Sequence, residues 1–482
     1  MRYLRHIVLI ILMALLCPLA HADKKQDVQK AINKFVNAPS LKHASVGVSV
    51  MRLKENKVMG EYCPMQSQIT ASTMKTVTSA TALSLLGKDF RFHTTITTDG
   101  EIKGSCIDGN IIITGSGDPT LGSVHFSDSI NFVEQVISAL KARGINEIHG
   151  KIIVDDSAYP APYVSGDWMV EDLGYDYGAS VHALNFCDNT LRLNYEVDKD
   201  KIIYNTNEGQ TYLKLMNHST IINEDDDSTQ ITGPEFRLDI NDDVLHLFGT
   251  MKPEKSSRTI ANPSPDLLLR DSVTTSIKNA GIVILNNNYT PCSAVEPTLL
   301  LDFESPALTD IISSLLERSD NMFTESVLRA IAVDSCKIGT TYNGVEIVRN
   351  YWKEQGVDVE GLFMVDGSGL ARTNKAPVSF FNHMLAQSLS ILKEQGLEFN
   401  TLFPIAGKNG TVKRLTANTS AEGKFALKSG SMSHVQCYVG YYPAENPEYT
   451  VSILVNSFTD RRADLVKLIS NMLIDIDKTL RN

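Results

Sequence analysis

The two ends of this 482-residue chain have similar patterns of secondary-structure signals, and the middle has a different pattern. Helix-like and strand-like patterns are mixed at both ends, whereas the middle consists mainly of short β-type runs broken by turn residues. A single hydrophobic core stops growing at about 250–300 residues, so a chain of this length forms two or three domains. The pattern predicts one α/β (α+β) domain, made of residues 23–89 and 296–482, that is interrupted by an insert over residues 90–295.

The insert is expected to be mainly β. Its β-branched runs, such as residues 111–113, alternate with turns rich in Gly, Pro and Asp. We expect it to form two subdomains, which are residues 90–165 together with 265–295, and residues 166–264.

The terminal parts of the chain carry clearer signals of secondary structure. Residues 70–86 are helix-like and stop at Gly87. Residues 435–441 and 449–455 each alternate and are separated by a short loop, which is typical of an antiparallel strand pair. The last segment has an apolar stripe, which includes Leu465, and it predicts a helix packed on the sheet rather than a membrane anchor. The terminal domain is therefore expected to be an antiparallel sheet flanked by helices.

The N-terminus has the pattern of a secretory signal peptide. Arg2 and Arg5 form a basic region, and residues 7–16 form an apolar run too short to span a bilayer comfortably. A small-x-small pattern ends at Ala22, so we predict that residues 1–22 are removed after Ala22 and that the mature protein is periplasmic. A buried N-terminal helix is the alternative.

The charge balance excludes some classes of partner. The net charge of −11 becomes −13 when the two arginines of the signal peptide are removed. Nucleic acids and anionic membranes both need a basic face, so neither is expected as the main partner. No later segment is long and apolar enough to cross a membrane.

Six cysteines remain after the signal peptide is removed, and no two of them form a C-x-x-C pair. They are Cys63, Cys106, Cys187, Cys292, Cys336 and Cys437. This spacing gives no support to a zinc or redox site, so we expect no metal and no cofactor. In an oxidising compartment some of the six could form disulfides, and the sequence does not choose among the pairings.

The first polar motif is the S-x-x-K sequence formed by Ser72 and Lys75. At the start of a helix these residues lie three positions apart and share a face. A serine hydroxyl becomes a good nucleophile when a base takes its proton, and a lysine can be that base if burial lowers its pKa. Two other S-x-x-K matches, which begin at Ser138 and Ser390, are interpreted as solvated helix surface.

The second polar motif is the S-x-N sequence formed by Ser319 and Asn321, between two helix-like segments. In a loop at the edge of a cleft, Ser319 could relay a proton and Asn321 could hold a substrate amide. Ser, Asp and Asn also suit a helix N-cap, so a purely structural role is the alternative. Another S-x-N match, Ser129 to Asn131, lies in the insert.

The third polar motif is formed by Lys428, Ser429, Gly430 and Ser431, and no other K-S/T-G sequence occurs in the chain. We expect it at the end of a strand. Glycine allows backbone to approach closely, and a lysine with two hydroxyls suits a substrate carboxylate. A plain connection from strand to turn is the alternative.

In this order the three motifs resemble those of penicillin-binding proteins and serine β-lactamases. Further similarity extends over residues 115–121, 168–189, 365–372 and 404–411. Together they resemble the D-alanyl-D-alanine carboxypeptidase/endopeptidase family, the class C low-molecular-mass penicillin-binding proteins. The resemblance covers the chain from about residue 40 to 460, and it implies a β-lactamase-like peptidase domain with a long insert.

The resemblance also implies a mechanism through an acyl-enzyme. Lys75 would take the proton of Ser72, which attacks the carbonyl of the penultimate D-alanine. Ser319 would pass the proton to the leaving group, and the backbone N–H groups of Ser72 and Ser431 would hold the oxyanion.

Substrate binding is assigned by the same resemblance to Asn321, Lys428, Ser429 and Ser431. The last three would hold the terminal carboxylate. Ser429 stands where the family usually has Thr, and it keeps the hydroxyl that binding needs. The implied partners are peptidoglycan stem peptides, with β-lactam antibiotics as covalent inhibitors.

The alternatives to a D-Ala-D-Ala peptidase are a β-lactamase and a non-catalytic protein that binds the cell wall. A β-lactamase needs rapid deacylation, and no matching glutamate segment is present; the long insert also disfavours it. A non-catalytic protein that binds the cell wall is disfavoured because all three motifs are intact. The sequence does not decide between a carboxypeptidase and an endopeptidase.

Overall fold

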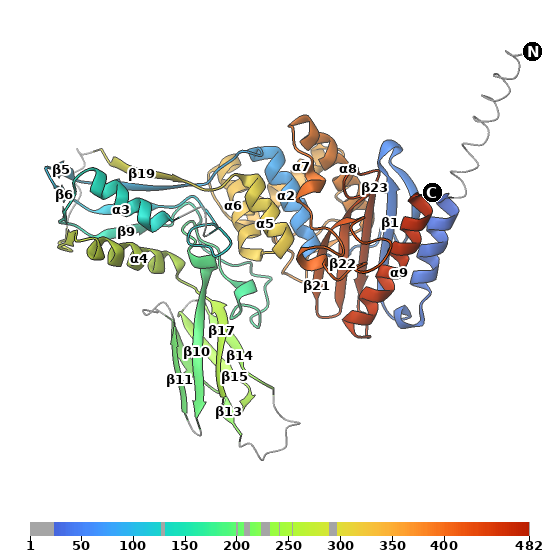
Figure 1. Ribbon diagram of the computed structural model, residues 1–482, viewed down its shortest axis with the longest axis horizontal. Helices are drawn as coiled ribbons and strands as arrows, with labels where there is room; N and C mark the ends of the chain where they lie inside the picture. Colours follow the sequence, from blue (N-terminus) through green and yellow to red (C-terminus); the bar gives the residue numbers. More distant parts are fainter. Residues whose placement is uncertain are drawn as a thin grey trace, which may run out of the picture.

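The structure is a computed structural model (Figure 1). It describes residues 24–126, 131–198, 201–206, 213–222, 232–240, 242–252, 254–288 and 296–481. The expected signal peptide and Ser129 of the second S-x-N match lie outside the described residues, whereas Asn131 of that match is the N-cap of α3 Phe132–Ala142. Figure 1 shows an elongated molecule, with a body of sheet and helices at one end, one lobe at the other end and a second lobe that projects sideways from between them.

The two ends of the chain build one five-stranded antiparallel sheet with the order β2-β1-β23-β22-β21. Its strands are β1 Ser45–Arg52, β2 Lys57–Tyr62, β21 Ala426–Met432, β22 Val435–Tyr442 and β23 Tyr449–Asn456. The central strands β22 and β23 are buried along their whole length because helices cover both faces of the sheet.

The two alternating runs are confirmed as an antiparallel pair, but their apolar sides face opposite layers. The register pairs Val439 with Ser452 and Tyr438 with Ile453. Side chains of paired residues lie on the same face. Val439 therefore packs into one core of the domain, whereas Ile453 and Tyr438 pack into the other.

A layer of helices covers one face of the sheet, and two helices cover the other. The larger layer contains α2 Lys75–Leu86, α5 Leu308–Arg318, α6 Asn321–Cys336, α7 Thr341–Glu354 and α8 Val378–Glu394. The opposite face carries the helix over residues 24–36 and α9 Arg462–Arg481 (Figure 1). Shorter elements are β3 Gln68–Ile69, β20 Lys375–Ala376, η1 Pro39–Leu41, η2 Leu53–Glu55, η3 Ala71–Met74, η7 Phe399–Leu402 and η8 Gly410–Val412.

The prediction for the last helix is confirmed. The apolar stripe of α9 is buried against the sheet: Leu465, Ile469, Met472 and Ile476. Across the described ranges, no helix has the length and apolar character needed to span a bilayer.

The first lobe of the insert contains two four-stranded sheets, with the orders β19-β4-β7-β9 and β18-β8-β6-β5. The strands are β4 His93–Thr98, β5 Glu101–Lys103, β6 Cys106–Asp108, β7 Ile111–Thr114, β8 Glu147–Ile148, β9 Ile152–Asp155, β18 Val283–Ile284 and β19 Thr298–Glu304. Two helices accompany them, α3 Phe132–Ala142 and α4 Pro265–Asn279.

The second lobe consists of small sheets with the orders β11-β10-β17, β12-β15-β14 and β13-β16. Its strands are β10 Thr190–Asp198, β11 Lys201–Thr206, β12 Lys214–Asn217, β13 Thr220–Ile221, β14 Glu235–Asp239, β15 Val244–Phe248, β16 Thr250–Met251 and β17 Glu254–Ala261. Two short 3-10 helices precede it, η4 Asp176–Gly178 and η5 Cys187–Asn189.

The end expected for the insert, residue 295, does not match the strand pairing. Strand β19 pairs along its length with β4, from Thr298 opposite Thr98 to Glu304 opposite His93. A strand belongs to the sheet that satisfies its backbone hydrogen bonds, so we propose that the insert ends after Glu304. The division into two subdomains remains a proposal, and the separate sheets of the two lobes support it.

Of the described cysteines, Cys63, Cys106, Cys336 and Cys437 are free thiols. Cys292 lies outside the described residues.

Leu473 tests the packing of α9 on the sheet, because its side chain is completely buried there. We expect Leu473→Ala to lower the free energy of unfolding by about 2–5 kcal/mol, through lost transfer energy and a residual cavity. Lys467→Ala, at an exposed position of the same helix, should change it by less than about 0.5 kcal/mol. Thermal and urea unfolding of both variants measure the difference, and equal stabilities would contradict the packing.

Candidate active site

Ser72 and Lys75 lie where a 3-10 turn passes into an α-helix. Ser72 belongs to η3, and Lys75 is the first residue of α2. The Lys75 Nζ lies 3.0 Å from the Ser72 Oγ. The helix ends at Leu86 and is capped by Gly87, as predicted. The S-x-x-K spacing therefore becomes one turn that brings an amine to a hydroxyl.

The Lys75 ammonium is fully buried and has three hydrogen-bond partners. It donates to the Ser72 Oγ, to the Asn321 Oδ1 at 2.5 Å and to the Ser368 carbonyl at 2.6 Å. A neutral amine has two N–H donors and one lone pair. With Asn321 and Ser368 taking the donors, the lone pair of neutral Lys75 would face the Ser72 hydroxyl.

The environment of Lys75 also favours its neutral form. Burial lowers the pKa of Lys75 to about 8, because the interior disfavours the charged form. The carboxylates of Asp366, Glu325 and Asp320 act in the opposite direction and keep the pKa from falling further.

Ser319 and Asn321 come from the junction between α5 and α6. Ser319 caps α5 in the left-handed conformation, with φ of 65°. The neighbouring Asp320 is the N-cap of α6 and accepts from the backbone N–H of Phe323 at 3.0 Å. The helix N-cap that was the structural alternative for this motif is therefore Asp320. The side chains of Ser319 and Asn321 remain available to the cleft.

Lys428 connects the second motif with the third. Its Nζ is fully buried and donates to the Ser319 Oγ at 2.8 Å and to the Ser429 carbonyl at 2.6 Å. The Ser429 hydroxyl donates to the Thr411 Oγ1 at 2.6 Å. Asn321 is held from the other side, since its Nδ2 donates to the Tyr177 carbonyl at 2.7 Å.

The third motif occupies the C-terminal part of strand β21, which agrees with the expected position at the end of a strand. Strand β21 continues to Met432 and pairs with β22 along its length, from Ala426 opposite Tyr441 to Met432 opposite Val435. The turn follows at Ser433 and His434, where φ of His434 is 58°. Because the hairpin turn is short, β21 stays paired with β22 through Ser429, Gly430 and Ser431, although Ser and Gly are common in turns.

Gly430 allows this strand to lie directly against the Ser72 segment. A Cβ at position 430 would stand 2.6 Å from the Thr70 carbonyl oxygen and 3.0 Å from the Ser72 backbone nitrogen. Both contacts involve backbone atoms that have little freedom to move. Only glycine fits this close approach.

The three motifs meet at a cleft of about 530 Å³. Ser72, Ser319, Asn321 and Ser431 line it. Lys75 and Lys428 are buried beneath this lining and contact it through Ser72 and Ser319, and Ser429 is buried beside Lys428, which donates to its carbonyl. The structure therefore brings together all seven residues singled out in the sequence.

The model of the D-Ala-D-Ala carboxypeptidase 3 (S13) family matches residues 28–472. The chain belongs to this family. It is 24% identical over 467 residues to a D-alanyl-D-alanine carboxypeptidase of Actinomadura sp. (strain R39), covering 91% of this chain and 82% of that protein. It is also 24% identical over 462 residues to the D-alanyl-D-alanine carboxypeptidase DacB of Haemophilus influenzae, covering 90% and 91% of the two chains.

Solved structures show the same fold. The crystal structure of penicillin binding protein 4 (dacB) from Haemophilus influenzae superposes with a TM-score of 0.75 at 21% identity, over 94% of this chain and 98% of that one. A crystal structure of the same protein complexed with a β-lactam gives a TM-score of 0.72. These comparisons confirm the fold class, the family and the class of enzyme, a serine-type D-Ala-D-Ala carboxypeptidase.

The insert supplies a second wall of the cleft in this S13 family member. Its residues there include Glu171, Asp172, Tyr177 and Glu235. Arg372, from the loop after the D-G-S-G sequence, also lines the cleft. The carboxylates of Glu171, Asp172 and Glu235 therefore face the same cleft as the Arg372 guanidinium.

Two buried carboxyl groups behind Lys75 were missed by the sequence reasoning about the site. The Glu325 Oε1 accepts from the Ser368 backbone N–H at 2.7 Å, and burial raises the pKa of Glu325 to about 7. Glu325 lies four residues after Asn321 on α6, so helical spacing could have placed it on the same face.

Asp366 is the second buried carboxyl group, and it organises the loop that carries Ser368. It accepts from the backbone N–H groups of Gly369 and Ala371, both at 2.7 Å, and from Trp168 Nε1 at 2.9 Å. Trp168 belongs to the insert, so Asp366 also ties the insert to the peptidase domain. In the sequence, residues 365–372 showed only a similarity to the family and did not indicate the contacts that Asp366 makes.

Gly430→Ala tests the close approach of β21 to the Ser72 segment. The added Cβ must push the strand from the Thr70 carbonyl, and a displacement of about 1 Å at a reacting group can lower a rate about 100-fold. We expect a loss of that order in kcat/KM for release of D-alanine from a D-alanyl-D-alanine peptide. Gly166→Ala, whose Cβ meets no atom within 4 Å, should leave kcat/KM unchanged. Normal activity of Gly430→Ala would contradict the steric argument.

Proposed function

We propose that this S13 family member is a periplasmic D-Ala-D-Ala carboxypeptidase that acts on peptidoglycan stem peptides through an acyl-enzyme on Ser72. The observation that carries the proposal is the buried Lys75 amine, 3.0 Å from the Ser72 hydroxyl. A fully buried amine with a lowered pKa is a base that can activate a serine near neutral pH. The predicted signal peptide supports the periplasmic location.

In the acylation step, the Ser72 Oγ attacks the carbonyl carbon of the penultimate D-alanine and its proton passes to the Lys75 Nζ. The new C–O bond forms a tetrahedral intermediate, and the C–N bond to the terminal D-alanine then breaks. The leaving amine needs a proton, which the Ser319 hydroxyl delivers. The proton that Lys75 took from Ser72 then passes to the Ser319 oxygen, so Lys75 returns to its neutral form and Ser319 to its hydroxyl form. The Lys428 Nζ, 2.8 Å from the Ser319 Oγ, favours this relay because a neighbouring cation stabilises a transient alkoxide.

The developing oxyanion is assigned to the backbone N–H groups of Ser72 and Ser431. The close approach at Gly430, where a Cβ would stand 3.0 Å from the Ser72 nitrogen, supports this assignment. It brings the outer edge of β21 beside the first turn of the nucleophile segment. Donors that are fixed in place before the reaction stabilise the charge without reorganisation.

The terminal carboxylate of the substrate is assigned to Lys428, Ser429 and Ser431. Burial lowers the pKa of Lys428 well below its ordinary value, and the positive charge of Lys75 adds to this effect. A bound carboxylate restores the cationic form of Lys428 by charge pairing. Ser429 acts from beneath the cleft with Thr411, and Ser431 acts from its surface. Asn321 holds the substrate amide.

Water then hydrolyses the acyl-enzyme and regenerates Ser72. A β-lactam carries a strained amide and a carboxylate in the same relation, so it acylates Ser72 and remains attached. The β-lactam complex of the Haemophilus influenzae relative supports this part of the proposal.

Digestion of purified peptidoglycan fragments distinguishes the two activities of this class. A carboxypeptidase releases free D-alanine from pentapeptides, whereas an endopeptidase separates cross-linked dimers into monomers. Mass spectrometry of the products reads both. We expect release of D-alanine; cleavage of dimers alone would assign the protein as an endopeptidase.

Ser72→Ala tests the nucleophile. We expect the variant to lose both peptide hydrolysis and covalent labelling by a fluorescent penicillin, because Ser72 supplies the hydroxyl among the described partners of the Lys75 amine. Ser138→Ala removes the exposed serine of another S-x-x-K sequence, and it should behave like the unchanged protein. In the unchanged protein, a stable label would indicate the proposed enzyme, and rapid turnover of the penicillin would indicate a β-lactamase. No reaction would indicate a non-catalytic protein. Labelling retained in Ser72→Ala would reject the assignment.

The pH dependence of acylation tests Lys75 as the base. The pKa of Lys75 is about 8, so below that pH the protonated, inactive form predominates. The second-order rate of acylation by a fluorescent penicillin should rise about tenfold per pH unit up to about pH 8 and then level off. The Ser72→Ala variant gives the non-specific background at each pH. A rate that stays constant from about pH 6 to 9 would rule out Lys75 as the titrating base.

A further inference from the structure

Four side chains gather on one face of a small sheet in the first lobe of the insert, far from the cleft (Figure 1). Strands β6 and β8 run parallel, with Cys106 opposite Glu147 and Ile107 opposite Ile148. Side chains alternate along a strand. Ile107 and Ile148 therefore fill the core, where both are fully buried. The residues on either side of them project to the outer face.

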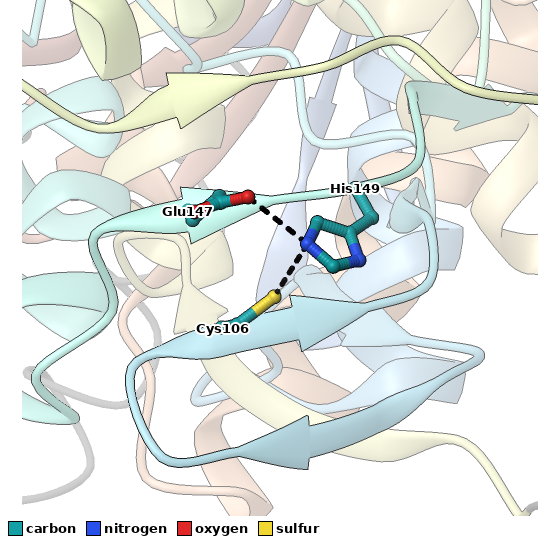
Figure 2. Close-up of side chains that lie close together, drawn as sticks. All are labelled: Cys106, Glu147 and His149. Carbon is teal, nitrogen blue, oxygen red and sulfur yellow. Dashed lines mark hydrogen bonds and ion pairs between the residues drawn. The ribbon is translucent and has the colours of Figure 1, made fainter.

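Three of these outer side chains converge on one another. The His149 Nε2 lies 3.1 Å from the Cys106 Sγ and 3.0 Å from the Glu147 Oε1. Figure 2 shows the imidazole, the thiol and the carboxylate pointing toward a common point above the two strands. All three donor atoms lie within 4.8 Å of one another. Each side chain is partly exposed, so an ion could reach the cluster from solvent.

The fourth side chain, Asp108, supports the imidazole from behind. The His149 Nδ1 lies 3.1 Å from the Asp108 Oδ1, and the Lys103 Nζ donates to the Asp108 Oδ2 at 3.2 Å. A carboxylate at Nδ1 places the proton on that nitrogen and leaves the lone pair of Nε2 for a metal. This arrangement is typical of histidines that bind zinc.

We propose that Cys106, Glu147 and His149 form a binding site for Zn²⁺ or a chemically similar divalent transition-metal ion. A thiolate, an imidazole and a carboxylate are the three ligand types that zinc takes in proteins. Three protein ligands leave a fourth position for water. Binding releases the thiol proton of Cys106 to solvent and forms the metal–sulfur bond.

The observed separations are close to those a tetrahedral ion requires. Bonds of about 2.0–2.3 Å at tetrahedral angles place the donor atoms about 3.4–3.6 Å apart. The contacts of 3.1 and 3.0 Å at His149 Nε2 need to open by about half an ångström. Small rotations of the partly exposed Glu147 and Cys106 side chains supply this change.

The charges around the cluster favour a cation over a reactive thiolate. Glu147 and Asp108 place two negative charges beside Cys106, partly offset by Lys103. Without a cation, these carboxylates oppose ionisation of the thiol. A bound divalent ion reverses this effect and links β6 to β8.

The expectation of no metal rested on the absence of C-x-x-C spacing. The ligands here come from two strands that are separated by α3, and only their parallel register brings Cys106 beside Glu147. The nearest pattern in the sequence is the E-x-H formed by Glu147 and His149, which is too short to indicate a site alone.

Metal binding is measured on the full mature chain, reduced and stripped with a chelator. Titration with Zn²⁺ against a chromophoric indicator should show one tightly bound ion per chain. Replacement by Co²⁺ should give the near-ultraviolet absorption of a cobalt–thiolate bond. Cys106→Ser is expected to lose the thiolate band and at least about 100-fold in zinc affinity, with an unchanged circular dichroism spectrum.

Three control variants separate this site from others. Cys63→Ser removes an exposed thiol elsewhere, and His218→Asn removes a histidine 2.9 Å from His246 that could bind ions by itself. Both should keep the thiolate band. Asp108→Asn should keep the band and lower the affinity about 10–100-fold, because the support of His149 is weakened. No tight ion in the unchanged protein, or a thiolate band that survives Cys106→Ser, would overturn the proposal.

Discussion

The peptidase site depends on the burial of one ammonium group. The Lys75 Nζ joins three parts of the chain, through the Ser72 Oγ, the Asn321 Oδ1 and the Ser368 carbonyl. A buried lysine is tolerated only where its donors are satisfied and its charge is balanced or lost. The same packing that satisfies Lys75 therefore assembles the nucleophile, the α5–α6 junction and the D-G-S-G loop. Structural stability and catalytic geometry rest on a single set of contacts.

Close backbone approach makes this assembly possible. Gly430 brings β21 against the Ser72 nitrogen, and Gly369 packs against the Ala71 carbonyl, where a Cβ would stand 2.0 Å away. Ala71 and Ser319 both adopt positive φ, 45° and 65°. Such conformations store about 1–3 kcal/mol each in non-glycine residues and persist only where the surroundings enforce them. Ala71 adjoins the proposed nucleophile Ser72, and Ser319 is itself a proposed catalytic residue, so the strain lies where position matters most.

The insert has two distinct relations to the rest of the molecule. Near the cleft it supplies Asp172, Tyr177 and Glu235, and Trp168 ties it to the buried Asp366. At its far end, the Cys106–Glu147–His149 cluster lies on a sheet that does not touch the cleft (Figure 1). The insert thus lines one side of the peptidase cleft, while the metal site proposed in its outer lobe involves none of the residues that line that cleft.

The sequence alone predicted the fold class, the helix that ends at Gly87, the antiparallel pair near the C-terminus and the packing of the last helix. These features depend on local periodicity and on residues such as glycine that act within one or two turns. The order of the three motifs likewise identified Ser72, Ser319 and Lys428 as a group, because each short motif contains the reactive side chains themselves and can be recognised without knowledge of the fold.

Only the tertiary structure decided what depends on pairing between distant segments. The strand through the third motif, the pairing of β19 with β4, the opposite faces of β22 and β23 and the buried Glu325 all follow from register and burial. The Cys106 cluster has the same origin. Local sequence determines which helices and strands form and which side chains they carry. Contacts between residues hundreds of positions apart determine which of those side chains meet. The free energy that holds these contacts comes from the packed core as a whole, so no local segment reveals them.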